Sequence, residues 1–400
     1  MTTADAYNSI KKWWYLPFLA YVIPNIFMAG FTSVIDLLFV DNIPLPLTAS
    51  YWQIGISLIL VLLSFYFIKY VSLTFNKIGF AYRDSAPSSY LGVVIFILQF
   101  FQLIVLIIFD FGRVGGVSTS SNYLVLLASY IPSDTLFLVY YGHHRKNGVP
   151  WFNLAVYLIT SILQGWTGIW LILFFIEFYH QLNVIPFKRV VRRGLLVIIV
   201  LALLYPVIDK YKYILRGGED FQAHTALESA GALMNRLQQV SGVILIYQEQ
   251  AQLSRALNDN EIIPFYLDNR LGLLFSYSAQ RVSMQKYLTT NYLIDRDLFS
   301  RDTDIDALGW YTNVGIAGWF LVLSPIENVF YIFFIILIIV VPFLINHYFL
   351  KSKEIIPVIQ TLTIIYAFHG WFSVQLGFIS GVILYVMLYN LFIKRVTNSY

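Results

Sequence analysis

The chain has 400 residues, of which 58% are hydrophobic and only 12% are charged, whereas an ordinary soluble domain has about 25% charged residues. That balance excludes a water-soluble fold. Cysteine is absent, which excludes disulfide bonds, thiolate nucleophiles and Cys-ligated metal sites, and the net charge of +4 is modest. We therefore predict an integral membrane protein.

Membrane-spanning helices are predicted where apolar stretches approach the roughly 20 residues that cross about 30 Å of hydrocarbon. The stretch 151–181 is divided into two short helices that turn at residues 164–168, because the basic segments on both flanks require an even number of crossings. The ten predicted spans are 13–34, 51–69, 89–110, 122–141, 151–164, 167–181, 194–208, 326–349, 355–370 and 373–393.

Basic residues gather in every second segment between these spans, and the positive-inside rule places such segments in the cytoplasm. They are Lys11, Lys12, Lys69, Lys77, Arg83, Arg145, Lys146, Lys188, Arg189, Arg192, Arg193, Lys351, Lys353, Lys394 and Arg395. We therefore predict cytoplasmic termini, with seven spans in residues 1–208 and three in residues 326–400. The charged segment between them, residues 209–325, is predicted to be an extracytoplasmic loop domain that re-enters the membrane at its end.

Two helices are predicted in this loop domain. Apolar residues recur at three- and four-residue steps over residues 221–256, and a second helix is predicted over residues 264–292 because it begins with proline. On the first helix, Arg236 is expected to share a narrow face with small residues and Gln239. The predicted fold class is all-α: about ten transmembrane helices and one large helical loop domain.

Three arginines on the predicted outer side are candidates for holding a diphosphate, because a guanidinium donates two parallel charge-assisted hydrogen bonds and stays cationic. Arg236 is the strongest candidate, and its alternative is a surface ion pair. Arg216 precedes two glycines next to a membrane exit. Arg113 lies in a glycine-rich turn, where the alternative is a side chain that extends to the membrane surface.

A base that removes a proton from a sugar hydroxyl needs a pKa near neutrality, which histidine has without any perturbation. Among the outward-facing groups His224 is preferred, with Glu219, Asp220 and Glu228 as competitors, and the alternative for these residues is a solvated helix face. His369 lies at an outer turn and is either a base or an interfacial anchor.

Acidic residues inside apolar spans are costly and usually functional. Glu177 lies in the sixth predicted span, and Asp134, the deepest, follows Pro132 in the fourth. For Asp134 a buried polar contact beside a proline kink is favoured over catalysis. The sequence has no metal-ligand spacing, phosphate-binding loop or nucleic-acid-binding pattern, so no metal, cofactor or nucleic-acid partner is expected.

In its layout and in three short segments the chain resembles the Wzy-type O-antigen and oligosaccharide repeat-unit polymerases, membrane glycosyltransferases related to the O-antigen ligases. The segments are Leu163-Gln164-Gly165-Trp166-Thr167-Gly168, Leu233-Met234-Asn235-Arg236-Leu237 and Trp310-Tyr311-Thr312-Asn313-Val314-Gly315. The Arg-x10-Gly spacing proposed for some members is absent, since 14 residues separate Arg216 from Gly231.

The resemblance implies a GT-C-like fold and metal-independent glycosyl transfer at the periplasmic face of a bacterial inner membrane. The donor would be a growing glycan on undecaprenyl diphosphate, the acceptor a single lipid-linked repeat unit, and the product O-antigen or a related surface polysaccharide. Outer-loop arginines would hold the diphosphate, and a chain-length regulator protein is an expected partner. The competing interpretations are an O-antigen ligase, a lipid-linked oligosaccharide flippase, and a sensor or assembly subunit without chemistry.

Overall fold

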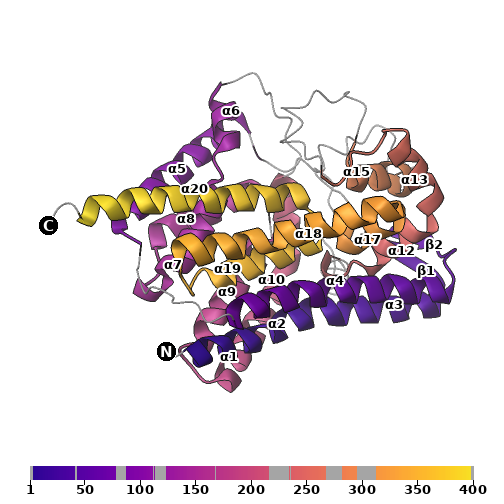
Figure 1. The fold of residues 1–400 in the computed structure, drawn as a ribbon, viewed down its shortest axis with the longest axis horizontal. Helices are drawn as coiled ribbons and strands as arrows, with labels where there is room; N and C mark the ends of the chain where they lie inside the picture. The colour runs from indigo at the N-terminus through magenta and orange to yellow at the C-terminus, as the bar shows by residue number, and fades with distance from the viewer. Residues whose placement is uncertain are drawn as a thin grey trace.

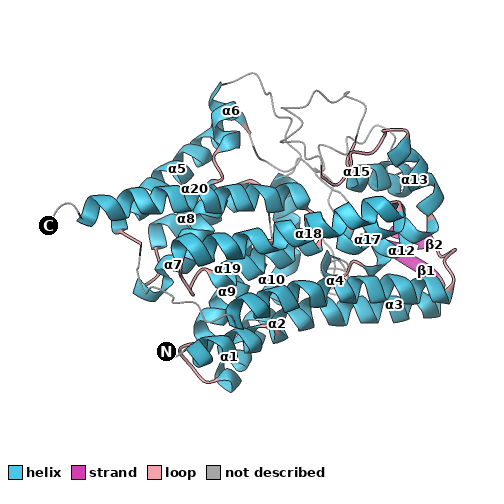
Figure 2. Ribbon diagram, viewed as in Figure 1, coloured by secondary structure: helices cyan, strands magenta, loops and turns pink. Residues whose placement is uncertain are grey.

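The structure is a computed structural model that describes residues 3–40, 43–77, 87–110, 112, 123–166, 168–215, 234, 236–266, 282–294 and 312–397. The described part is mostly helical, and the helices run largely along the long axis of the molecule (Figure 1). Two short strands are the exception (Figure 2).

Six of the described helices are long and apolar enough to cross a membrane. They are Asn8–Ile35, Tyr51–Phe75, Ser89–Phe109, Tyr123–Asn147, Pro325–Leu350 and Phe372–Phe392. Each coincides with a predicted span. By length and composition they confirm that the chain is a mostly helical protein embedded in a membrane, whereas the total of ten spans stays a prediction.

The first of these helices combines four consecutive elements. They are α1 (Thr3–Trp13), α2 (Tyr15–Pro17), the π-helical η1 (Phe18–Val22) and α3 (Ile23–Ile35). Pro17 and Pro24 have no backbone N–H to donate, and the π-helical turn lies between them. At the start of the helix, Trp13 Nε1 donates to the carbonyl oxygen of Phe175 at 2.8 Å, which ties the first span to a helix far along the chain.

The rest of the first half contains helices that largely follow the predicted spans. They are α4 (Tyr51–Lys77), α5 (Ser89–Phe109), α6 (Tyr123–Tyr130), α7 (Ser133–His144), the 3-10 turn η2 (Arg145–Asn147), α8 (Trp151–Leu163), α9 (Ile169–Leu182) and α10 (Phe187–Leu215). The predicted span 122–141 corresponds to the candidate span Tyr123–Asn147, in which only Ile131 and Pro132 interrupt the helix, as expected for a proline kink. Two short helices at 151–181 are confirmed as helices, and their crossing of the membrane stays a prediction.

The described part of the second half contains short helices and two long helices, and three of its helices continue into a π-helical turn. They are α12 (Val240–Gln248), α13 (Gln250–Asn258), α15 (Met284–Leu288), η3 (Thr289–Ile294), α17 (Gly315–Val322), α18 (Pro325–Ile345), η4 (Asn346–Leu350), α19 (Ile356–Thr363), η5 (Ile364–Phe368) and α20 (Phe372–Thr397). Ser324 caps α18 in a capping box with Glu327, as expected for a serine three residues before a glutamate.

Both helices predicted in the loop domain are interrupted. The one over 221–256 is wrong where Gln238 and Gln239 are non-helical, and Glu249 separates α12 from α13. The one over 264–292 is wrong at residues 264–266, which are non-helical, and at Val282 and Ser283, which form a bridge with Ile262 and the extended cap of α15; residues 267–281 lie outside the described residues. A local capping group, the side chain of Ser283, starts only α15, whereas the N-caps of α12 and α13 make no side-chain capping bond of their own.

The helix α12 is buried in the bundle. Every side chain from Val240 to Ile246 is buried, and the helix packs against α3, α4, α17 and β1. A helix whose residues are apolar or small all round is expected to be covered on all sides. The described part of residues 209–325 thus shares one hydrophobic cluster with the membrane helices, and the predicted domain boundaries stay predictions.

A two-stranded hairpin, which the sequence analysis did not predict, follows the first long helix. Strands β1 (Leu37–Val40) and β2 (Ile43–Pro46) pair antiparallel with Leu38 opposite Leu45. Both of these leucines are buried, whereas Pro44 and Pro46 are exposed. The hairpin and α13 lie at one end of the long axis, and both chain termini lie at the other (Figure 1).

This arrangement predicts that the two ends of the molecule are on opposite sides of the membrane. Because the chain has no cysteine, single cysteines report their own position. We expect Asn8→Cys to react with a membrane-impermeant maleimide from one side only, and Thr48→Cys and Asp259→Cys only from the other; all three residues are exposed. Labelling of all three from the same side would contradict the arrangement.

Candidate functional site

Of the site residues proposed from the sequence, the structure describes Arg236 and His369. Arg236 is exposed, whereas the non-helical Gln239 is buried, so the predicted common helical face of these two residues is wrong. The others lie outside the described residues, and their roles stay predictions: Arg113, Arg216, Glu219, Asp220, His224 and Glu228.

Arg236 borders a place where three chain segments enter or leave helices. These segments are residues 236–239 before α12, residues 312–315 before α17, and residues 369–371 between η5 and α20. We call them together the polar junction. His369, in the third segment, contacts both of the others. Its Nε2 lies 3.3 Å from the carbonyl oxygen of Arg236, and its own carbonyl oxygen accepts from Gly315 N at 3.2 Å.

Asn25 of α3 fixes the start of α12. Its Oδ1 accepts from both Gln239 N and Val240 N at 2.8 Å, and its Nδ2 donates to the carbonyl oxygen of Tyr21 at 2.6 Å. The first N–H groups of a helix have no partner within the helix, and burying them unpaired is costly. A fully buried carboxamide from the first long helix supplies that partner.

Two glycines allow the segments of the polar junction to approach each other. Gly315 and Gly370 have φ values of +64° and +75°, a region that favours glycine. A Cβ on Gly370 would lie 3.0 Å from Gly315 N, so any side chain there would push against the backbone of Gly315. Asn313 links the second segment to the third, because its Oδ1 accepts from Trp371 Nε1 at 3.0 Å.

Three polar atoms in the polar junction or beside it are buried without a described hydrogen-bond partner. Gln239 Nε2, Ser241 Oγ and Tyr21 OH are buried and have no hydrogen-bond partner in the described part of the chain. Non-helical backbone at membrane depth is tolerated where it is buried in protein or lines a polar site. The exposed guanidinium of Arg236, next to these buried groups, can bind an anionic group.

The structure assigns His369 a different environment from the one expected. Its ring is only 4% exposed and packs against Tyr21 and Trp371, with centroid distances of 5.5 and 5.2 Å. It is therefore not an interfacial anchor. Through its contact with the carbonyl oxygen of Arg236 it positions the segment that carries the guanidinium.

Sequence reasoning missed Asn25. The signal that could have identified it is a carboxamide in the middle of an apolar span, directly after Pro24. A polar side chain at membrane depth needs a partner, and here the partner is the end of another helix.

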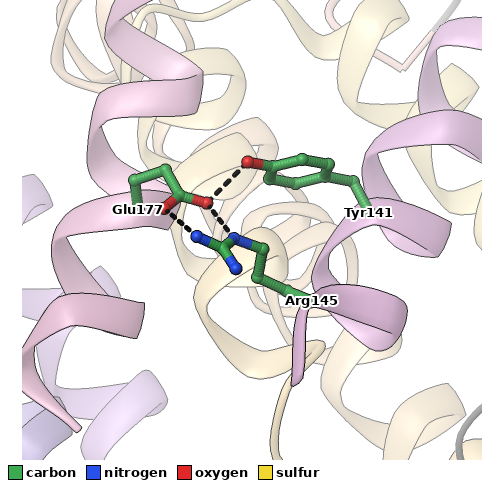
Figure 3. A network of polar contacts seen from close by, with 3 residues as sticks. All are labelled: Tyr141, Arg145 and Glu177. Carbon is green, nitrogen blue, oxygen red and sulfur yellow. Dashed lines mark hydrogen bonds and ion pairs between the residues drawn. The ribbon is translucent and has the colours of Figure 1, made fainter. Parts of the chain in front are cut away.

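A second group of polar side chains joins α7 to α9 (Figure 3). Arg145 binds Glu177 through two bonds, Nε to Oε1 at 2.6 Å and Nη2 to Oε2 at 2.9 Å. Tyr141 OH donates to the same carboxylate at 2.5 Å. The side chains of Arg145 and Glu177 are only 17% and 30% exposed. This bidentate ion pair is therefore more shielded from solvent than a typical surface ion pair.

The end of α7 also contacts two further helices. Lys146 lies 3.3 Å from Glu354, which precedes α19, and His143 Nδ1 lies 2.9 Å from Tyr385 OH in α20. Glu177, which the sequence analysis considered as an intramembrane acid, is thus fully engaged with Arg145 and Tyr141. We interpret this group as a structural connection among the helices.

Asp134 lies at the interruption between α6 and α7. It is close enough to Tyr157 and Tyr366 to interact electrostatically with both, and Tyr366 belongs to the π-helical η5. The preceding Ser133 donates to Gln102 of α5. The structure therefore combines an acidic group, two phenols and two irregular helices, an arrangement that the expected proline kink explains in part.

Among the residues that the structure describes, no three His, Asp or Glu side chains are grouped closely enough to hold a metal ion. No family model, curated protein or solved structure matches the chain.

The bonds of Asn25 predict a large effect of removing its side chain. We expect Asn25→Ala to lower the thermal unfolding temperature of the detergent-purified protein by several degrees, since two buried N–H groups lose their acceptor at a cost of roughly 2–4 kcal/mol. Asn291→Ala is the matched control, because Asn291 is exposed and donates only to a carbonyl oxygen one turn before it. Equal unfolding temperatures for the two variants would contradict the capping role.

The Arg145–Glu177 pair predicts strong coupling in a double-mutant cycle. With Arg145→Gln and Glu177→Gln, we expect a coupling free energy of about 1.5–3 kcal/mol, because the bonds are charge-assisted and shielded. The single contact between Lys146 and Glu354, with the lysine 41% exposed, should couple by less than about 1 kcal/mol in the same cycle. Thermal or denaturant unfolding measures both coupling free energies. A larger coupling for Lys146 and Glu354 than for Arg145 and Glu177 would contradict the structural role of the Arg145–Glu177 pair.

Proposed function

We propose that the chain is a membrane glycosyltransferase that polymerises oligosaccharide repeat units carried on a lipid diphosphate, at the extracytoplasmic face of a bacterial inner membrane. The observation that carries the proposal is the exposed guanidinium of Arg236 beside the buried, incompletely bonded polar groups of the polar junction. The layout shared with Wzy-type polymerases supports the same assignment.

In the proposed reaction a sugar hydroxyl of the acceptor forms a bond to the anomeric carbon of the donor glycan. The bond from that carbon to the diphosphate breaks, and the lipid diphosphate leaves with the electron pair. Preorganised cations stabilise the developing negative charge most effectively where water is excluded. Arg236 supplies such a cation, and Arg216 and Arg113 are further candidates. A base must accept the hydroxyl proton, and His224, Glu228, Glu219 and Asp220 are the proposed candidates.

Arg236 is well placed to hold a diphosphate because its backbone is fixed while its side chain is exposed. Its carbonyl oxygen contacts His369, and three residues later the chain is bound by Asn25. A fixed backbone lowers the entropic cost of placing a long side chain on a ligand. In this proposal both termini are cytoplasmic, and a chain-length regulator protein is a partner.

A lipid-linked oligosaccharide transporter is the second candidate, and a specific observation favours it. Helices are irregular in both halves of the chain, at Ile131–Pro132 and in η5, and Asp134 lies close to Tyr366 where these two regions meet. Discontinuous helices with an ionisable group at membrane depth are typical of transporter binding sites. An O-antigen ligase, which uses the same donor chemistry, is the alternative enzyme.

The test of the proposed function compares two exposed arginines of the same region. Arg236→Ala should leave the protein inserted but reduce the surface glycan of a complemented deletion strain to single repeat units. Arg255→Ala, on the exposed side of α13, should support normal chain lengths. Gel analysis of the lipopolysaccharide ladder measures both, and normal ladders from Arg236→Ala would remove this residue from the mechanism.

The deletion strain itself discriminates the candidate functions. Single-unit caps on the lipid A core support a polymerase, and free lipid-linked polymer without caps would indicate a ligase. Lipid-linked single units that stay on the cytoplasmic side would indicate a transporter. In that last case Asp134→Asn should reproduce the deletion phenotype, whereas for a polymerase it should affect glycan length only as far as it lowers the amount of folded protein.

A further inference from the structure

The start of α10 carries four basic side chains on its exposed face. Lys188, Arg189, Arg192 and Arg193 are all exposed, and none of them forms an ion pair with an acidic residue in the described ranges. At 100° per residue they span about 140° of the helix circumference. The opposite side, with Val190 and Gly194, is buried, and Gly194 faces Phe174 and Phe178 of α9.

Between the second turn and Lys210 the same exposed face is entirely apolar. Leu196, Ile199, Val200, Leu203 and Val207 lie within the angular range of the four basic residues, and their exposed fractions range from 44% to 72%. From Leu196 to Val207 the helix rises about 16 Å, close to half of the roughly 30 Å hydrocarbon thickness of a bilayer. The apolar part of this face is therefore long enough to cover one leaflet.

A neighbouring segment adds cations at the charged end of this face. The ring of Tyr15 lies 6.1 Å from that of Phe187, the first residue of α10, so the two helices are adjacent there. One turn before Tyr15, Lys11 and Lys12 are both exposed. Like charges gathered at a membrane surface repel each other unless anions lie among them.

We propose that this face of α10 binds an anionic phospholipid, with its phosphate headgroup among Lys188, Arg189, Arg192 and Arg193 and an acyl chain along Leu196, Leu203 and Val207. Charge complementarity selects an anionic headgroup, and the apolar continuation of the same face selects a lipid over a soluble phosphate or an acidic protein segment. Arginine forks match phosphate oxygens in pairs, which favours a held lipid over a diffuse attraction. The site is separate from the polar junction and does not depend on the proposed glycosyl transfer.

The experiment is native mass spectrometry of the full-length protein in detergent with an equimolar mixture of dioleoylphosphatidylglycerol and dioleoylphosphatidylcholine. We expect wild type to retain the anionic lipid preferentially. The triple variant Arg189→Gln, Arg192→Gln, Arg193→Gln should lose this preference by roughly 100-fold, about fivefold for each charge. The corresponding lysine variant should keep most of it.

The matched control removes three charges elsewhere: Arg255→Gln, Lys351→Gln and Lys353→Gln. Its lipid preference should equal that of wild type. If the triple variant does not insert, Arg192→Gln alone should reduce the preference about fivefold. High ionic strength should weaken the preference of the wild type, because exposed charges are screened.

Three results would overturn the proposal. The first is a wild type that retains both lipids equally, and the second is a control variant that loses the preference as much as the α10 variant does. The third is a protein that dimerises through α10 and shows no lipid preference, since the face would then be an interface between two copies of the chain.

Discussion

Inside an apolar bundle the end of a helix has no water to satisfy its backbone groups, and the carboxamide of Asn25 satisfies them where α12 begins. The rest of the polar junction depends on this bond. It allows the chain to leave a helix at Gln238 and Gln239, enter the bundle and start a buried helix. Without such an acceptor α12 would have to begin at the membrane surface, where its apolar sides would be exposed.

Two regions of the bundle are held together by different kinds of interaction. Around Arg145, ion pairs and hydrogen bonds of Arg145, Lys146 and His143 connect α7 to α9, to the start of α19 and to α20. Around Arg236, backbone-to-backbone and carboxamide contacts dominate, and several polar atoms have no partner in the described ranges. The region around Arg236 has fewer strong side-chain connections than the region around Arg145, as we expect of a site that exchanges large substrates in the proposed glycosyl transfer.

The long helices could be predicted because their signal is local. An apolar run of sufficient length needs no knowledge of its neighbours, and all six long helices coincide with predicted spans. The short elements depend on contacts distant in sequence. Gln239 is non-helical because Asn25, 214 residues away, offers an acceptor, and Val282 is non-helical because Ile262 pairs with it. Neither the apolar periodicity of the first predicted helix nor the proline that begins the second could reveal these contacts.

The candidate site could be predicted only in part for the same reason. Arg236 was identified from its charge and its position in a polar segment, and the structure places it beside the buried groups of the polar junction. Asn25 is a single polar residue in an apolar run, and only its partner reveals its role. His369 looked like a surface group because it precedes a glycine turn, yet packing with Tyr21 and Trp371 buries it.

The hairpin that ends the first long helix has a consequence for self-association. In the register of β1 and β2, Ile43 and Leu45 are the residues of β2 that can donate to β1, while Pro44 and Pro46 alternate with them. The outer edge of β2 therefore has proline nitrogens where another strand would need N–H donors. A passing chain cannot extend this sheet through a regular ladder, so the exposed hairpin is protected against edge-to-edge aggregation.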